Sequence, residues 1–196
     1  MLVADVYNKI AKEFDRTRRT VWTHVGEFLD TLEPRARVFD IGCGNGKNML
    51  YRDDLNMWGM DISKEQVKVC QSKGLLVVEG NMTKLPYSDA VLDAVLCTAS
   101  YHHLKTDTER QQALSEMYRC LKPGGKVLLT VWDSGKEICE DTLVPWKSQD
   151  GITYERYYRK YSQKGLEEEI RRLEPRFQVG LVLFEKGNWY VVLTKV

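Results

Sequence analysis

The sequence predicts an α/β fold: a doubly wound sheet, mostly parallel, that ends in an antiparallel hairpin. Three observations predict it. From residue 36 to residue 132, short β-rich runs alternate with helical patterns. These runs are apolar on both faces, which is typical of parallel strands covered by helices on both sides. Near the C-terminus two further β-rich runs, 178–185 and 189–194, are joined by a short loop containing Gly187, as in a hairpin.

The remaining elements follow in order along the chain. Helical spacing of apolar residues predicts helices near the N-terminus, and a helix is also expected from about Asn45. Ser63 with Gln66, and Thr106 with Glu109, are capping boxes that begin two more helices, which a glycine and a Lys-Pro-Gly-Gly run end. The expected parallel strands are 36–41, 57–60, 75–78, 90–97 and 126–132.

Composition excludes several classes of protein. The chain has 196 residues and a formal net charge of +1, which suits one domain and neither demands nor excludes a nucleic-acid partner. The five cysteines are scattered without a C-x-x-C pair, so we expect no metal site, no disulfide and a reducing compartment. No apolar run reaches the ~18 residues of a membrane span, and the charged N-terminus is unlike a signal peptide.

The strongest motif is a glycine loop where the first strand ends, residues 38–46 (VFDIGCGNG). Glycines there let the chain turn tightly and let a ligand lie against bare backbone. A dinucleotide fingerprint would place its third glycine at position 47, which is Lys47. The G-x-G-x-G spacing, with Asp40 two residues ahead, instead resembles the S-adenosylmethionine loop of class I methyltransferases. The resemblance implies their Rossmann-like fold, with S-adenosyl-L-methionine as the cofactor.

Polar groups after the next two strands agree with this cofactor. Asp61 ends the second strand about twenty residues past the loop, where a carboxylate can accept both ribose hydroxyls. The Asn81 amide and the Met82 backbone N–H are expected to read the adenine edge, although the family often has Asp at position 81. The expected cofactor contacts are Tyr7, Asp40, Gly42, Cys43, Gly44, Gly46, Asp61, Ile62, Asn81, Met82 and Thr98.

Two adjacent histidines follow the fourth strand, in the loop that faces the transferable methyl group in the methyltransferase order. His102 and His103 are expected to orient the acceptor or the methionine end of the cofactor; the alternative is a capped strand end with one histidine in solvent. Arg18 is expected to pair with a carboxylate of the cofactor or of the substrate. These three residues are the candidate catalytic groups.

Three segments outside the core resemble the tRNA wobble-uridine methyltransferases, as do the two histidines and Val131-Trp132. The segments are 7–22, the pair 142–147 and 157–161, and 165–168. Members of that family, the yeast-type enzyme and the methyltransferase part of the AlkB-homologue fusion, esterify 5-carboxymethyluridine in the tRNA anticodon. The expected single domain then has an N-terminal helical cap (1–33), a cofactor-binding core (34–132), a substrate-side insertion (133–165) and a C-terminal helix with the hairpin (166–196).

Basic and aromatic residues are interleaved in two of these segments, and we expect them to bind the tRNA anticodon loop rather than DNA. Arginine and lysine meet phosphates, and tyrosine faces stack on unpaired bases. The alternative is a solvated charged face with ordinary tyrosine packing. The expected RNA contacts are Arg16, Arg19, Lys147, Arg156, Tyr157, Arg159 and Lys160.

The expected chemistry needs no general base. A carboxylate acceptor is already ionised at neutral pH, so the resemblance implies residues that position the acceptor, not a proton acceptor. Three alternatives stay open. They are a methyltransferase acting on a small metabolite, a non-catalytic cofactor-binding subunit and, disfavoured by Lys47, a nicotinamide oxidoreductase.

The third strand is expected at an edge of the sheet, where unpaired backbone groups beside apolar side chains need covering. The wobble-uridine family is similar in being activated by a small zinc-binding subunit, so we expect a heterodimer in which that subunit adds a strand along 75–79. The N-terminal helices or a second copy are the alternative covers. Val77→Arg would disturb the contact if Val77 faces the partner. We expect a cytoplasmic and also nuclear protein without a membrane contact.

Overall fold

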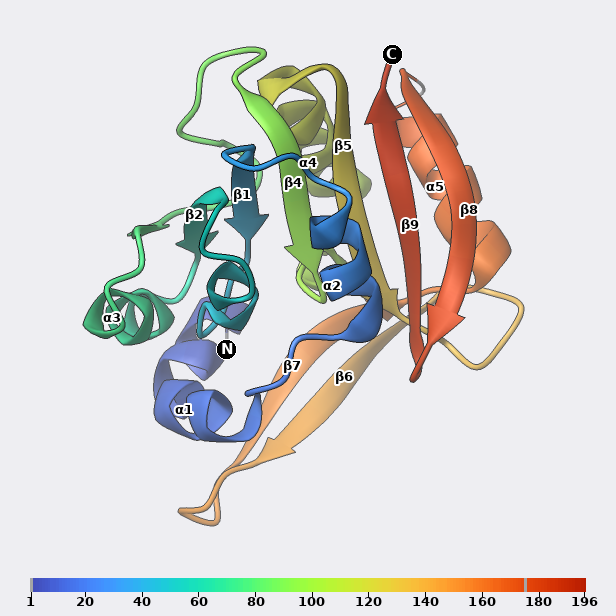
Figure 1. Ribbon diagram of the computed structural model, residues 1–196. Helices are drawn as coiled ribbons and strands as arrows, with labels where there is room; N and C mark the ends of the chain where they lie inside the picture. The colour runs from blue at the N-terminus through green and yellow to red at the C-terminus, as the bar shows by residue number, and fades with distance from the viewer. Residues whose placement is uncertain (1, 175) are drawn as a thin grey trace.

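A computed structural model of the chain describes residues 2–174 and 176–196. Within these residues seven strands form one sheet. In spatial order they are β3 (Val77–Glu79), β2 (Asn56–Asp61), β1 (Arg37–Ile41), β4 (Leu92–Thr98), β5 (Leu121–Trp132), β9 (Asn188–Lys195) and β8 (Phe177–Glu185). The first five are parallel, whereas β9 runs antiparallel to both β5 and β8 (Figure 1). This topology confirms the predicted fold class.

Helices cover both faces of the sheet. They are α1 (Val3–Thr17), α2 (Thr23–Asp30), α3 (Lys64–Ser72), α4 (Asp107–Cys120) and α5 (Gln163–Leu173), with 3-10 turns η1 (Lys47–Leu50) and η2 (Tyr101–His103). Phe28 of α2 packs on one face and Leu114 of α4 and Ile170 of α5 on the other; Figure 1 shows α2 in front of β4 and β5 and the other two behind. No helix in the described ranges has the length and apolar character to cross a bilayer.

The predicted helix starts are confirmed by their caps. The Ser63 hydroxyl accepts a hydrogen bond from the Gln66 N–H at 3.3 Å. Thr106 and Glu109 each accept from the other's backbone N–H, at 3.2 and 3.0 Å. These bonds satisfy donors that the first turn of a helix otherwise leaves unpaired.

Several predicted boundaries are wrong, and β5, for example, begins at Leu121 and not at residue 126. The helix expected from about Asn45 is only the turn η1, because the link between β1 and β2 is too short to hold both the glycine loop and a full helix. The third strand, expected over 75–78, is paired only over Val77–Glu79. Leu75 instead packs beside Gly46 of the glycine loop, which takes it out of the ladder.

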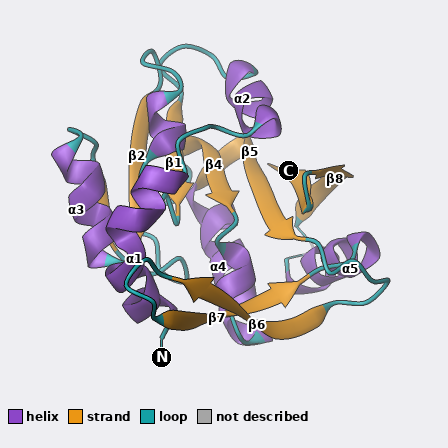
Figure 2. Ribbon diagram, turned by 90° about the horizontal axis from the view of Figure 1, so that it is seen from below, coloured by secondary structure: helices purple, strands orange, loops and turns teal. Residues whose placement is uncertain are grey.

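A second sheet, absent from the sequence prediction, is a hairpin of β6 (Glu140–Lys147) and β7 (Thr153–Lys160). Its turn holds Gly151 at φ +82°, and Asp150 accepts from the Ile152 N–H at 3.0 Å. Figures 1 and 2 show the hairpin beside α1, below the ends of the parallel strands at which the arrows point. Two segments far apart in the sequence therefore cover the carboxyl ends of the sheet, where open α/β sheets bind ligands.

Candidate functional site

A cavity of about 470 Å³ lies between the carboxyl ends of β1, β2 and β4 on one side and α1 and β7 on the other. That volume is typical of small-molecule and cofactor sites. Most of the predicted cofactor contacts line it, namely Tyr7, Gly42, Cys43, Gly44, Asp61, Ile62, Asn81, Met82 and Thr98. These nine predicted contacts therefore lie around one cavity, whereas the other two, Asp40 and Gly46, lie outside its lining.

The glycine loop adopts a backbone that other residues rarely adopt. Gly42, Gly44 and Gly46 have φ values of +65°, +55° and +75°. A Cβ on Gly42 would lie 2.4 Å from the Ser100 Cβ, and one on Gly44 would lie 3.0 Å from the Phe14 ring. Bare backbone thus faces the cavity at the first two glycines, whereas Gly46 lies behind them against α3 and supports the turn.

Asp61 is held in place by the loop that it faces. Its Oδ2 accepts from the Gly44 N–H at 2.8 Å and its Oδ1 from the Ser63 N–H at 2.9 Å. Burial raises the pKa of this carboxyl, and the backbone donors oppose that shift. Each oxygen keeps a second lone pair, so the carboxylate can still accept the two hydroxyls of a ribose.

Asp40 lies behind the cavity wall, which corrects its predicted direct contact. It is fully buried, and its Oδ2 accepts from the Asn48 amide at 3.2 Å. Asn48 lines the cavity and also donates to the Thr98 hydroxyl at 3.2 Å. Burial raises the pKa of Asp40 to about 7. Asp40 therefore orients Asn48, a site residue that the sequence analysis missed because a lone asparagine belongs to no motif.

The far end of the cavity suits an adenine ring. The Asn81 side-chain oxygen accepts from the Thr83 N–H at 3.0 Å, which leaves its amide nitrogen to donate to a ring nitrogen. Ile62 and Met82 line the same end with apolar groups. At this place the amide nitrogen of an asparagine can donate to a ring nitrogen of adenine, whereas an aspartate carboxylate would accept from the adenine amino group.

A chain of hydrogen bonds joins His103, Tyr7 and Arg156 at the opposite end of the cavity. His103 Nδ1 donates to the Tyr157 carbonyl at 2.8 Å, so its Nε2 accepts from the Tyr7 hydroxyl at 3.1 Å. Arg156 Nη1 donates to the same hydroxyl at 3.3 Å. Burial lowers the pKa of His103 to about 4, so the ring is neutral at pH 7 and its acceptor nitrogen is occupied. His103 is a positioning group and not a general base.

His102, predicted as a catalytic residue, does not line the cavity. It is fully buried, and its Nδ1 accepts from the Trp132 N–H at 3.3 Å. Burial, with smaller contributions from His103 and Arg156, holds its pKa well below the usual range. His102 therefore supports the wall of the site from behind, because the η2 turn directs only the second histidine into the cavity.

Arg18 lines the cavity near the glycine loop. Its carbonyl accepts from the Asn45 amide at 2.8 Å, which ties the end of α1 to that loop. Its guanidinium lies 5.5 Å from the Trp146 ring centroid, and the Arg156 guanidinium lies 5.1 Å from the same centroid. Both guanidinium groups therefore lie near one indole; the Arg18 backbone is bonded to the glycine loop, and the Arg156 side chain is bonded to Tyr7.

The predicted RNA contacts fall into two groups. Arg156 lies in the cavity, Arg159 is paired with Glu169 at 3.1 Å and Asp141 at 3.2 Å, and the Tyr157 ring lies under Lys105. The others are Arg16, Arg19 and Lys147, which are exposed, and Lys160, which is half-buried. The tyrosines at 154, 158 and 161 are buried, so the stacking on bases expected for this segment gives way to ordinary packing.

Four aromatic residues of the cavity were absent from the predicted site. Phe14 lies over the glycine loop, Trp22 also lines the cavity, and Trp132 stacks on Tyr158 with ring centroids 4.4 Å apart. All four fall in the sequence features that carry the family resemblance, and that resemblance was the available signal. Apolar periodicity alone assigns such residues to a core.

A family model described as a methyltransferase domain matches residues 39–129. The tRNA (carboxymethyluridine(34)-5-O)-methyltransferase of Arabidopsis thaliana is 39% identical over 132 residues, which cover 67% of this chain and 33% of the relative. The relative of that name from Schizosaccharomyces pombe is 30% identical over 224 residues and covers 98% of this chain and 96% of its own length. The chain belongs to this carboxymethyluridine methyltransferase family. It spans a third or less of the length of several family members.

A solved structure adds the fold. A Haloferax volcanii complex between the Trm112 methyltransferase activator and a methyltransferase matches with a TM-score of 0.72 at 17% identity, over 99% of this chain and 98% of that chain. At this identity the likeness shows the class I methyltransferase fold alone. S-adenosylmethionine, the cofactor of the family, fits the residues present. Bare backbone at Gly42 and Gly44, the two oxygens of Asp61 and the apolar end near Met82 suit its three parts.

Proposed function

We propose that the chain transfers a methyl group from S-adenosylmethionine to the carboxylate of 5-carboxymethyluridine at the wobble position of the tRNA anticodon, forming a methyl ester. The observation that carries this proposal is the family relationship, which extends over nearly the full length of both this chain and the S. pombe member. His103 supports it, because its acceptor nitrogen is already bonded to Tyr7 and an acceptor that is already an anion needs no base there.

The site's own residues position the acceptor. When bound, the cofactor supplies an electrophilic methyl group on a positively charged sulfur. A carboxylate with a pKa near ~4 carries no proton at pH 7, so no side chain has to accept one. Tyr7 and His103 are fixed to each other, and Trp132 stacked on Tyr158 gives that end an aromatic wall. Such a wall orients the acceptor and excludes water from the reacting atoms.

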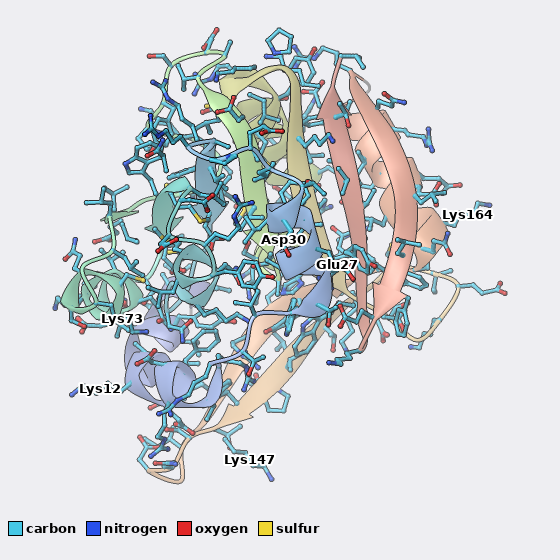
Figure 3. All side chains as sticks on the ribbon, in the orientation of Figure 1. Lys12, Glu27, Asp30, Lys73, Lys147 and Lys164 are labelled. Atoms are coloured by element: carbon cyan, nitrogen blue, oxygen red, sulfur yellow. The ribbon has the colours of Figure 1, made fainter. Side chains whose placement is uncertain are left out.

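Exposed basic residues on the two segments that cover the site support an RNA substrate. Figure 3 shows Lys12 on α1 and Lys147 on β6 projecting outward from the same end of the molecule. Arg16 and Arg19 add exposed guanidinium groups at the end of α1. We propose these four side chains as phosphate contacts. They replace Arg159, whose guanidinium is engaged by two carboxylates.

Methyl transfer from labelled cofactor tests the proposal, with three acceptors: tRNA containing 5-carboxymethyluridine, tRNA without it, and a metabolite extract. We expect a labelled methyl ester from the first alone. With saturating cofactor, kcat should change less than about twofold from about pH 7.5 to about pH 9, because the acceptor stays ionised and His103 stays neutral. His103 is neutral above pH 4 or so, and the window begins above the pKa of about 7 for Asp40.

The opposite results have definite meanings. A rate rising about tenfold per pH unit in this window would indicate an acceptor that must lose a proton, such as a hydroxyl, and would favour a small-metabolite methyltransferase. Cofactor binding without transfer to any of the three acceptors would favour a non-catalytic subunit.

We propose in addition a protein partner at the β3 edge of the sheet, which makes the functional form a heterodimer. The described part of β3 pairs only with β2, and the side chains of Leu76 and Val78 are 64% and 50% exposed. The N-terminal helix α1, an alternative cover, packs on α3 and β7. The H. volcanii protein of similar fold is complexed with an activator. A small zinc-binding subunit that adds a strand along 75–79 is the partner proposed.

Val78→Arg tests this contact. Val77, which the sequence suggested for the test, is 4% exposed and packs in the core with Val67, so a charge there would unfold the protein. Val78→Arg should abolish co-purification with the subunit without lowering the unfolding temperature of the chain alone. Leu181→Arg, at an 81% exposed position on the opposite edge strand β8, is the matched control and should retain the subunit. Equal retention by both variants would rule out the β3 edge.

The cellular compartment stays a prediction from the sequence. All five cysteines are free thiols, four of them buried, which suits a reducing environment. We propose a cytoplasmic location that extends to the nucleus, and imaging of a tagged chain in cells would test it.

A further inference from the structure

Arg156 is a buried cation with no acidic partner among the described residues. Arg156 is 6% exposed, and its Nε has no hydrogen-bond partner among the described residues. The other buried arginine, Arg110, is paired with Glu169 at 3.2 Å and with Asp107. A guanidinium taken out of water without an anion carries a large desolvation cost. Arg156 therefore indicates that an anion joins it when the site is in use.

The surroundings fix the guanidinium before any ligand arrives. Nη1 donates to the Tyr7 hydroxyl at 3.3 Å. The central carbon lies 5.1 Å from the Trp146 ring centroid, 5.2 Å from that of Tyr158 and 5.8 Å from that of Tyr7. Aromatic faces attract a cation but do not neutralise it. The indole N–H of Trp146 is also buried without a partner, so two donors beside each other are unsatisfied.

Two carboxylates would enter this site, one on the cofactor and one on the acceptor. The predicted ribose and loop contacts, Asp61 and Gly44, lie at the ends of β2 and β1, and Arg18 is tied to that loop. Arg156 is instead joined through Tyr7 to His103, which follows β4. Its place is therefore on the acceptor side, whereas the backbone of Arg18 is bonded to the glycine loop.

We propose that Arg156 binds the acceptor carboxylate and so selects 5-carboxymethyluridine over uridines that lack the acid, an inference that rests on the proposed function. A forked guanidinium matches the two oxygens of a carboxylate. In the reaction one carboxylate oxygen forms a bond to the methyl carbon as the carbon–sulfur bond breaks; the electron pair stays on sulfur and no proton moves. The product ester is neutral, so Arg156 holds it less tightly than the substrate, which favours release.

Arg156→Met, with Arg156→Lys as the conservative variant, tests this assignment. For modified tRNA we expect kcat/KM to fall at least about 100-fold in Arg156→Met and less in Arg156→Lys, with the cofactor Kd within about twofold of wild type. The unfolding temperature of Arg156→Met should equal or exceed that of wild type, because an uncompensated buried charge is removed. Arg18→Met, at the second arginine near Trp146, is the matched variant and should weaken cofactor binding instead.

Two results would overturn the assignment. Weaker cofactor binding by Arg156→Met with an unchanged KM for tRNA would place the cofactor carboxylate on this arginine. A lower unfolding temperature, with activity lost in proportion to folded protein, would mark Arg156 as structural.

A binding measurement separates this inference from the tRNA function. With S-adenosylhomocysteine present, tryptophan fluorescence should show wild type binding the nucleoside 5-carboxymethyluridine at least about tenfold more tightly than 5-carbamoylmethyluridine, and Arg156→Met binding both equally. This selectivity in a wild type that does not methylate tRNA would refute the tRNA function and keep the role of Arg156. Equal binding of both nucleosides by wild type would refute that role.

Discussion

Replacing Gly44 by valine should abolish cofactor binding in a protein that remains folded. Gly44 has φ +55°, a conformation that costs a β-branched residue roughly 1–2 kcal/mol or more. Its added Cβ would lie 3.0 Å from the Phe14 ring, so that ring would also have to shift. The Gly44 N–H that orients Asp61 would shift with the loop. Calorimetry should show the affinity for S-adenosylmethionine falling at least about 100-fold.

Gly187→Val is the matched control for this substitution. Gly187 has φ +80° in the β8–β9 turn, with nothing within 4 Å of an added Cβ. The control should lose stability through backbone strain alone and bind cofactor with the affinity of wild type. Asp61→Asn should fall between the two, since the ribose hydroxyls lose a charged acceptor. Unchanged affinity in Gly44→Val would refute the assignment of this cavity to the cofactor.

The largest loss of stability is expected from Glu169→Leu. Glu169 is 3% exposed on α5, and its Oε1 accepts from the hydroxyls of Tyr101 and Tyr161 at 3.2 and 2.8 Å. Its Oε2 contacts Arg159 at 3.1 Å and Arg110 at 3.2 Å. Leucine would leave the buried Arg110 with Asp107, near the surface, as its only acidic partner. The expected cost is about 3 kcal/mol in the free energy of unfolding.

Urea unfolding measures this cost, with Glu168→Leu as the control. Glu168 is the preceding residue of α5, and its 3.6 Å contact with Lys164 is exposed on both sides. The control should change the free energy of unfolding by no more than about 0.5 kcal/mol. A loss below about 1 kcal/mol in Glu169→Leu would mean that the cluster relaxes around leucine, and that Glu169 does not hold α5 to η2 and β7.

The parts of the fold that sequence reasoning found are those set by local rules. Ser63 and Thr106 begin helices because their side chains satisfy nearby N–H groups, a property of a few consecutive residues. The glycine loop is equally local, because its positive φ values require glycine at each of three places. The order of the parallel strands and the edge position of β3 followed from these elements once the motif had suggested the topology.

The parts that sequence reasoning missed depend on contacts between distant segments. The hairpin of β6 and β7 has a charged, aromatic sequence that reads equally well as an RNA-binding surface, and only its packing against α1 buries Tyr154. Arg156 and Arg159 lie three residues apart, yet one faces a cavity and the other an ion pair with Glu169. Asp40 differs from Asp61 in the same way. Both lie in strands, but only Asp61 lines the cavity.

Helix α1 is hydrogen-bonded both to the glycine-loop half of the site and to the β6–β7 hairpin. Asn8 accepts from the Ser63 hydroxyl at 2.8 Å, and Asp15 binds Lys73 at 2.5 Å and the Asn45 amide at 3.0 Å. These bonds join α1 to the half of the site that holds the cofactor. The hairpin meets α1 through aromatic rings and through several polar contacts. Glu13 accepts from Ser148 and from the Gln149 N–H, and the Tyr7 hydroxyl contacts Arg156 and Tyr158. Replacing the hairpin together with the α1 residues that it contacts therefore offers a route to new acceptors while the glycine loop and Asp61 are kept.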